Sequence, residues 1–175
     1  MILNFILFQV AWFACVAGAA AGKPFLGVVV TFFVLLWHLY QAKQCKIELK
    51  LILSVLITGA IFDQMMLSFH FIEYTHHGWG NSVVPVWILA LWLGFATTLN
   101  VSLAWMQGKT IVAVLFGAVG GPLAYLGAQK LGAVVLPSFT SYIVLSIGWA
   151  VLTPCFLIIA RHFNGYQNSS QESKP

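Results

Sequence analysis

Six long apolar stretches account for most of this chain, and they constrain its fold more than any other feature. They cover residues 2–21, 25–42, 49–69, 84–106, 110–128 and 138–160. A helix needs about 20 consecutive apolar residues to cross the hydrocarbon core of a bilayer. Strands of a membrane barrel alternate apolar and polar residues instead, and these stretches are apolar all round. The sequence therefore predicts an all-α integral membrane bundle of six transmembrane helices.

The composition supports lipid as the surrounding solvent. Of the 175 residues, 61% are hydrophobic and only 7% are charged. A soluble domain of this size requires far more charge on its water-facing surface. We therefore expect a single six-helix transmembrane domain over residues 1–162, with no soluble catalytic module. Residues 163–175 are polar and are expected to form a frayed cytoplasmic tail.

The basic residues predict the orientation of the bundle. With a cytoplasmic N-terminus, six basic residues fall on the cytoplasmic side and two on the outer side, which satisfies the positive-inside rule. Both termini are then cytoplasmic, and Glu48 lies in a cytoplasmic loop. No basic face alternates with stacking aromatic residues, so we expect no nucleic-acid partner. The six are Lys43, Lys46, Lys50, Lys109, Arg161 and Lys174, and the two are Lys23 and Lys130.

The one aspartate of the chain, Asp63, falls inside the third apolar stretch. An ionisable side chain at such a depth costs about 2.5–3.5 kcal/mol on insertion scales, and it usually marks a functional position. His70 and His77 follow at intervals of seven residues, which on a continuous helix would form a polar line suited to proton or cation movement. The alternative is that Asp63 is protonated or bonded to a neighbouring helix, and that the histidines are merely solvated.

Other polar residues within the apolar stretches fall into two layers. At about 1.5 Å per residue, Gln9, His38 and Asn100 lie at similar depths near the cytoplasmic ends of their stretches. Asp63 and Tyr125 lie together at a second level, nearer the outer surface. Asn100 has an amide that its own helix cannot fully satisfy, so we expect it to pair with His38 across a helix interface. These five residues are the predicted polar or ligand-binding positions.

The fifth stretch contains a helix-breaking signal at Gly120, Gly121 and Pro122. Pro122 has no N–H and therefore frees a carbonyl one turn earlier in the helix. We expect an interruption here, and two explanations stay open. One is a packing kink, and the other is a broken helix that lines a cavity, as in transporters.

The segment around His70, Glu73 and His77 has ligand types that zinc or copper accepts. The spacing matches no metalloenzyme motif, and a hydrated loop at the membrane surface is the alternative. No nucleophile elbow, phosphate loop or pair of adjacent acids occurs elsewhere. The sequence therefore assigns no catalytic residue and predicts no cofactor.

Several short motifs together carry a family resemblance across nearly the whole chain. The motifs are Asn4-Phe5, Trp37-His38, residues 59–63, residues 87–95 and residues 116–125. With these motifs, the chain resembles a family of uncharacterised bacterial inner-membrane proteins known only as a domain of unknown function. The resemblance implies a multi-pass protein of the bacterial inner membrane with a link to membrane lipid modification or envelope stress. It assigns a role to no residue.

These observations favour an accessory membrane protein that binds a lipid-like or small apolar ligand between its helices. A small proton-coupled transporter that uses Asp63 is one alternative. An intramembrane lipid-modifying enzyme that uses His38 or Asp63 as acid or base is another. Membrane lipid is the expected partner, and stripes of small residues such as Gly117 and Gly121 would also suit a contact between two copies.

Overall fold

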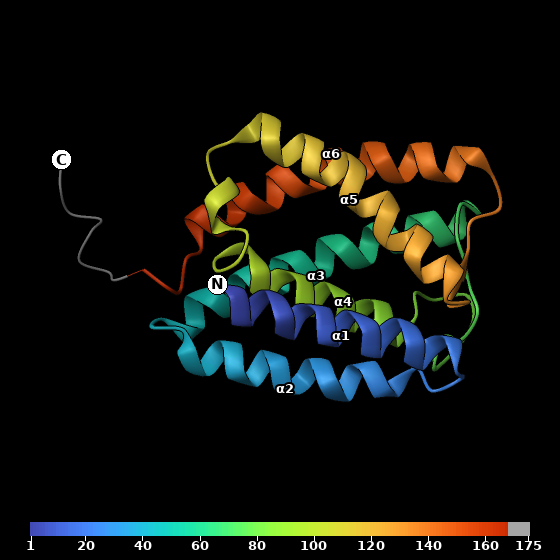
Figure 1. Cartoon of the computed structure of the whole chain (residues 1–175), viewed down its shortest axis with the longest axis horizontal. Coiled ribbons are helices and arrows are strands. Elements are labelled where there is room, and N and C mark those ends of the chain that lie inside the picture. Colours follow the sequence, from blue (N-terminus) through green and yellow to red (C-terminus); the bar gives the residue numbers. More distant parts are fainter. Residues whose placement is uncertain (168–175) are drawn as a thin grey trace.

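The computed structural model describes residues 1–167, and six α-helices make up most of this part of the chain (Figure 1). Each helix lies on one of the six predicted stretches, which confirms the all-helical fold. Four of them, α1, α3, α5 and α6, are long and apolar enough to cross a membrane, and α2 and α4 are shorter apolar helices. The bounds are α1 Ile2–Ala20, α2 Phe25–Gln41, α3 Cys45–Ser68, α4 Val86–Leu99, α5 Thr110–Lys130 and α6 Phe139–His162.

The fourth helix is shorter than the sequence predicted, because it ends at Leu99 and is followed by an irregular segment with the 3-10 helix η1, Ala104–Met106. Most residues of α4 are buried, since α1, α2 and α3 surround it. Non-helical backbone is tolerated at membrane depth where protein surrounds it. The Gln107 side chain donates to the Leu99 carbonyl at 3.0 Å, so the end of α4 is satisfied internally.

The helices form two groups, and most helix axes lie roughly along the long axis of the molecule (Figure 1). Helices α1 to α4 pack among themselves, whereas α5 packs mainly on α6 and crosses the bundle obliquely. We call the end where α1 begins and α6 ends the terminal end. At the opposite end, which we call the β end, β1 (Glu73–Tyr74) pairs antiparallel with β2 (Val134–Val135).

Helix α5 runs without a break through Gly120, Gly121 and Pro122, so the broken helix, one of the two explanations of the predicted interruption, is not present. The physical reason is a side chain from the neighbouring helix. Because Pro122 has no N–H, the carbonyl of Ala118 loses its helical donor. The Ser146 hydroxyl of α6 donates to this carbonyl at 2.7 Å and replaces that donor.

Many large apolar side chains point outward from the bundle. Phe33 of α2, Leu115 of α5 and Ile147 of α6 are each more than half exposed, and similar residues occur on every long helix. A soluble monomer rarely exposes apolar surface on this scale. The described chain therefore has the apolar helices and outer surface of a membrane protein.

Candidate functional site

A cavity of about 500 Å³ lies between α1, α4, α5 and α6. This volume falls within the range of about 300–1,000 Å³ that is usual for small-molecule sites. Its wall is mainly apolar and contains many aromatic side chains. These include Phe5, Phe8, Trp12, Phe95, Phe116 and Trp149.

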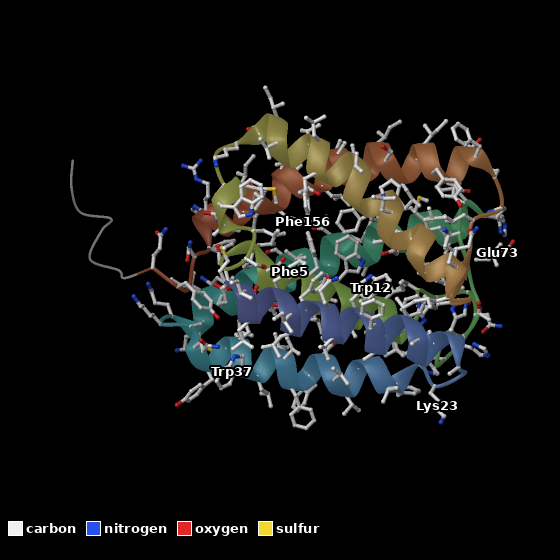
Figure 2. The ribbon with its side chains drawn as sticks, in the orientation of Figure 1. Phe5, Trp12, Lys23, Trp37, Glu73 and Phe156 are labelled. Atoms are coloured by element: carbon white, nitrogen blue, oxygen red, sulfur yellow. The ribbon has the colours of Figure 1, made fainter. Side chains whose placement is uncertain are left out.

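The cavity is elongated and opens at the side of the bundle. On α1 its wall runs from Phe5 to Val16, a rise of about 16 Å. One leaflet of a bilayer contributes about half of a 30 Å hydrocarbon core, so the two lengths are comparable. Phe5 of α1 and Phe116 and Leu123 of α5 line the cavity and are also exposed, which places its mouth between these two helices. Figure 2 shows Phe5 and Trp12 along α1, on the side that α5 crosses.

The Asp63 carboxyl group forms part of the cavity wall and is held by three hydrogen bonds. The hydroxyls of Tyr74 and Tyr125 donate to Oδ1 at 2.7 and 2.5 Å. The Trp92 Nε1–H donates to Oδ2 at 2.6 Å. The carboxyl group is fully buried, and no described cation forms an ion pair with it. These three hydrogen bonds compensate the carboxyl group for the missing water.

Local sequence explains how four elements meet at Asp63. Gly59 lies one helical turn earlier on α3, and a Cβ atom there would collide with the Trp92 indole of α4. The glycine therefore makes room for the ring that donates to Asp63. Tyr74 comes from β1, which pairs with β2 at the β end. Burial raises the pKa of the Tyr74 hydroxyl well above its ordinary value, and the adjacent carboxylate of Asp63 raises it further. Tyr74 therefore stays protonated and keeps donating.

A second polar cluster lies near the terminal end, and Glu48 is at its centre. The Glu48 side chain is completely buried in the first turn of α3. Its Oε1 contacts His38 Nε2 at 2.9 Å, and its Oε2 accepts from Asn100 Nδ2 at 2.9 Å and from the Gly165 N–H at 3.0 Å. The predicted pair His38 and Asn100 is thus joined through Glu48. The sequence predicts a loop at this residue, but it belongs to the first turn of α3.

The hydrogen bonds around His38 fix how many protons the cluster holds. The Tyr166 hydroxyl donates its one hydrogen to the His38 carbonyl at 2.7 Å, and it also lies 3.0 Å from His38 Nδ1. With that hydrogen on the carbonyl, we assign the hydrogen between Nδ1 and the Tyr166 oxygen to Nδ1. The contact between Nε2 and Glu48 holds one further proton, on either the ring or the carboxyl group. In both arrangements the pair has no net charge, which is the state that burial favours.

Tyr166 is itself held in the protonated form. Partial burial and the nearby Glu48 charge raise the pKa of its hydroxyl above the ordinary value. Residues 163–167 therefore pack on the bundle at this point and are not a free tail, in contrast to the prediction for residues 163–175. The rest of that predicted tail, residues 168–175, lies outside the described residues.

A protein-family model described as "Protein of unknown function (DUF2878)" matches residues 1–155. The chain belongs to this family. The predicted membership in a family of unknown function is therefore confirmed. The match contains every cavity-lining residue together with Asp63 and Glu48, and it ends before Gly165 and Tyr166. Comparisons with the curated proteins and with the solved structures gave no match.

The predicted layers of polar residues are partly rearranged within this DUF2878 fold. Tyr125 does meet Asp63, and His38 and Asn100 share one cluster. Gln9, however, lines the large cavity, whose wall does not include His38 or Asn100. Equal depth along the helices did not bring these side chains together, because Gln9 is on the face of α1 that looks toward the cavity.

The predicted polar line from Asp63 through His70 to His77 is interrupted, because α3 ends at Ser68. His70 has a left-handed backbone with φ of 57° and lies in the following turn. His77 Nδ1 lies 2.8 Å from the Val83 carbonyl, which occupies one of its two ring nitrogens. Within residues 1–167 no three histidine, cysteine or acidic side chains are placed to hold a metal ion. The structure therefore does not support the metal site suggested for His70, Glu73 and His77.

Proposed function

We propose that this chain is a multi-pass membrane protein that binds a lipid-like or small apolar molecule in the cavity between α1, α4, α5 and α6. The observation that carries the proposal is the cavity itself, with its volume of about 500 Å³ and its mainly apolar wall. Its mouth between α1 and α5 is lined by exposed apolar side chains, so a ligand would enter sideways from the lipid.

The geometry favours binding over the two alternatives. His38 belongs to a closed cluster with Glu48 and Tyr166, and it does not line the large cavity. At that position His38 cannot act as an acid or base on a substrate in the large cavity. Asp63 does border the cavity, but it is fully buried and three donors already hold its oxygens. Such a carboxylate is well suited to joining helices and poorly suited to cycling protons.

We further propose that all six helices cross the bacterial inner membrane with both termini in the cytoplasm. The first helix begins and the last helix ends at the same end of the bundle, as an even number of crossings requires (Figure 1). The basic residues predict which side that end occupies. The central helix α4 has protein around it, so its short length is compatible with a crossing.

The test is whether purified protein carries a ligand that a cavity-filling variant loses. A Cβ atom at Gly120 would meet no atom closer than 3.9 Å, and Gly120 lines the cavity, so Gly120→Leu adds a side chain that fills part of it. Val119 is the matched control, because it is on the same helix and 58% exposed, and Val119→Leu adds bulk outside the cavity. Native mass spectrometry of the full chain in mild detergent should show a co-purified lipid in the wild type and in Val119→Leu, and a loss of it in Gly120→Leu. A wild-type sample without ligand, or equal ligand in both variants, contradicts the proposal.

A further inference from the structure

We propose that the ligand of the cavity is an uncharged long-chain lipid with an oxygen atom that accepts a hydrogen bond from Trp149. This inference rests on the proposed function and names the chemistry of its ligand. It follows from two observations. Among residues 1–167, some polar groups of the cavity wall have no hydrogen-bond partner, and the wall contains no basic side chain.

The first observation is an unpaired donor in the cavity wall. Trp149 of α6 lines the cavity, and its Nε1–H is buried with no hydrogen-bond partner among residues 1–167. Its five-membered ring lies against Gly121, another residue of the wall. An indole N–H can only donate, so its partner must be an acceptor. A buried donor without a partner is costly, and a ligand oxygen at this position would remove that cost.

The neighbouring aromatic rings fix the position of this donor. Trp149 stacks on Trp92 with a distance of 5.0 Å between ring centroids and an angle of 12° between the rings. Trp92 in turn donates to Asp63, so its orientation is also set. Phe95 meets the Trp149 ring edge-on at 5.3 Å. Because the ring is held on these sides, the N–H is presented in a constant direction.

A second unpaired group lines the same cavity independently. Ser102, which follows α4, is 7% exposed, and its hydroxyl has no partner within the described chain. Gln9 of α1 adds a neutral amide to the wall. All three groups are uncharged, and each of them can donate a hydrogen bond to a ligand oxygen.

The charges of the wall decide what kind of head group can enter. Asp63 is the one acidic side chain in the wall, and no lysine, arginine or histidine belongs to it as the structure describes it. An anionic head would therefore find no counter-charge and would meet a buried carboxylate. A cationic head could not pair with Asp63 either, because that side chain is fully buried behind its three donors. An uncharged oxygen, such as that of an ester or an alcohol, is the group that fits.

The experiment compares probes with the same chain and different heads. Methyl myristate, myristate at alkaline pH and tetradecyltrimethylammonium are titrated into the full-length wild-type protein in detergent, with tetradecane as the probe that has no head. We expect the ester to bind at least about tenfold more tightly than either charged probe, which corresponds to about 1.4 kcal/mol. Equal binding of ester and charged probes overturns this inference.

A variant separates the role of the Trp149 donor from its role in packing. Trp149→Phe keeps an aromatic ring and removes the N–H, so it should weaken methyl myristate about tenfold and leave tetradecane nearly unchanged. Trp105→Phe is the control, because Trp105 is exposed and outside the cavity wall. An unchanged ratio of ester to alkane affinity in Trp149→Phe refutes the inference but leaves the binding function intact. A wild-type protein that binds none of the probes, tetradecane included, refutes both.

Discussion

The proton count in the Glu48 cluster predicts that Glu48→Gln is tolerated. The glutamine oxygen can accept from Asn100 and from the Gly165 N–H, as Oε2 does now. The new amide can donate to Nε2 of a neutral His38, whose Nδ1–H still goes to Tyr166. Every hydrogen bond then keeps a donor and an acceptor. The free energy of unfolding should therefore change by less than about 1 kcal/mol.

The same chemical change at Asp63 should have a much larger effect. All three partners of Asp63 donate, and Trp92 cannot accept. If the oxygen of Asp63→Asn faces Trp92, the amide nitrogen faces Tyr74 and Tyr125, and both hydroxyl hydrogens lose their acceptor. At about 1–3 kcal/mol for each group left unpaired, the expected loss is about 2–6 kcal/mol.

The difference is measured by unfolding the wild type, Glu48→Gln and Asp63→Asn in detergent. The loss of helical circular dichroism reports the unfolding. Glu73→Gln serves as the control for an amide substitution, because Glu73 is exposed at the β end. The reasoning is refuted if Glu48→Gln is destabilised as much as Asp63→Asn. That result would mean that the pair of Glu48 and His38 carries a net charge that the amide removes.

Two further predictions follow from the packing and the tyrosines. A Cβ atom at Gly121 would collide with the Trp149 side chain, so Gly121→Ala should lower the stability by about 1–3 kcal/mol. A Cβ atom at Gly120 would make no close contact, so Gly120→Ala should raise the stability by about 0.5–1 kcal/mol. Thermal unfolding checks this, and equal effects at the two positions would contradict the packing. The raised pKa values of Tyr74 and Tyr166 mean that their contribution to stability is complete below the ordinary tyrosine pKa of 10.0 and is lost as the pH rises through the folded values. Unfolding measured from neutral pH to above pH 10 should thus show a decline that is shallower in Tyr166→Phe, and an identical slope in the variant would argue against this role.

Hydrophobic length carried most of the fold prediction. The apolar stretches located all six helices, because helix length and bilayer thickness are linked by a fixed rise per residue. The helix break considered at Gly120–Pro122 is not present for a tertiary reason, since the hydroxyl that satisfies the Ala118 carbonyl comes from another helix. The end of α4 at Leu99 was missed for a similar reason, because burial by neighbouring helices allows an irregular continuation there.

The sequence predicted the candidate site only where a polar side chain within an apolar stretch needed a hydrogen-bond partner. A lone carboxyl group at membrane depth pointed to Asp63, and depth alone paired it with Tyr125. Glu48 was missed because its charge suggested a loop, although it shares a helical stripe with the buried Leu51, Ile52 and Val55. That spacing of three, four and seven residues was the available signal. Tyr74 and Tyr166 lie outside the helices. The hydrophobic periodicity of a sequence does not predict which helices such segments contact.

The contacts of Gly165 and Tyr166 also impose an order on biosynthesis. The chain is made from its N-terminus, so α2 and α3, with His38 and Glu48, leave the ribosome well before Gly165 and Tyr166 are made. Until then Glu48 lacks the Gly165 N–H, and His38 is a partner that has already been made. The hydrogen bonds of Gly165 and Tyr166 can form only after α6 has been made, so they are among the last contacts of the described chain to form.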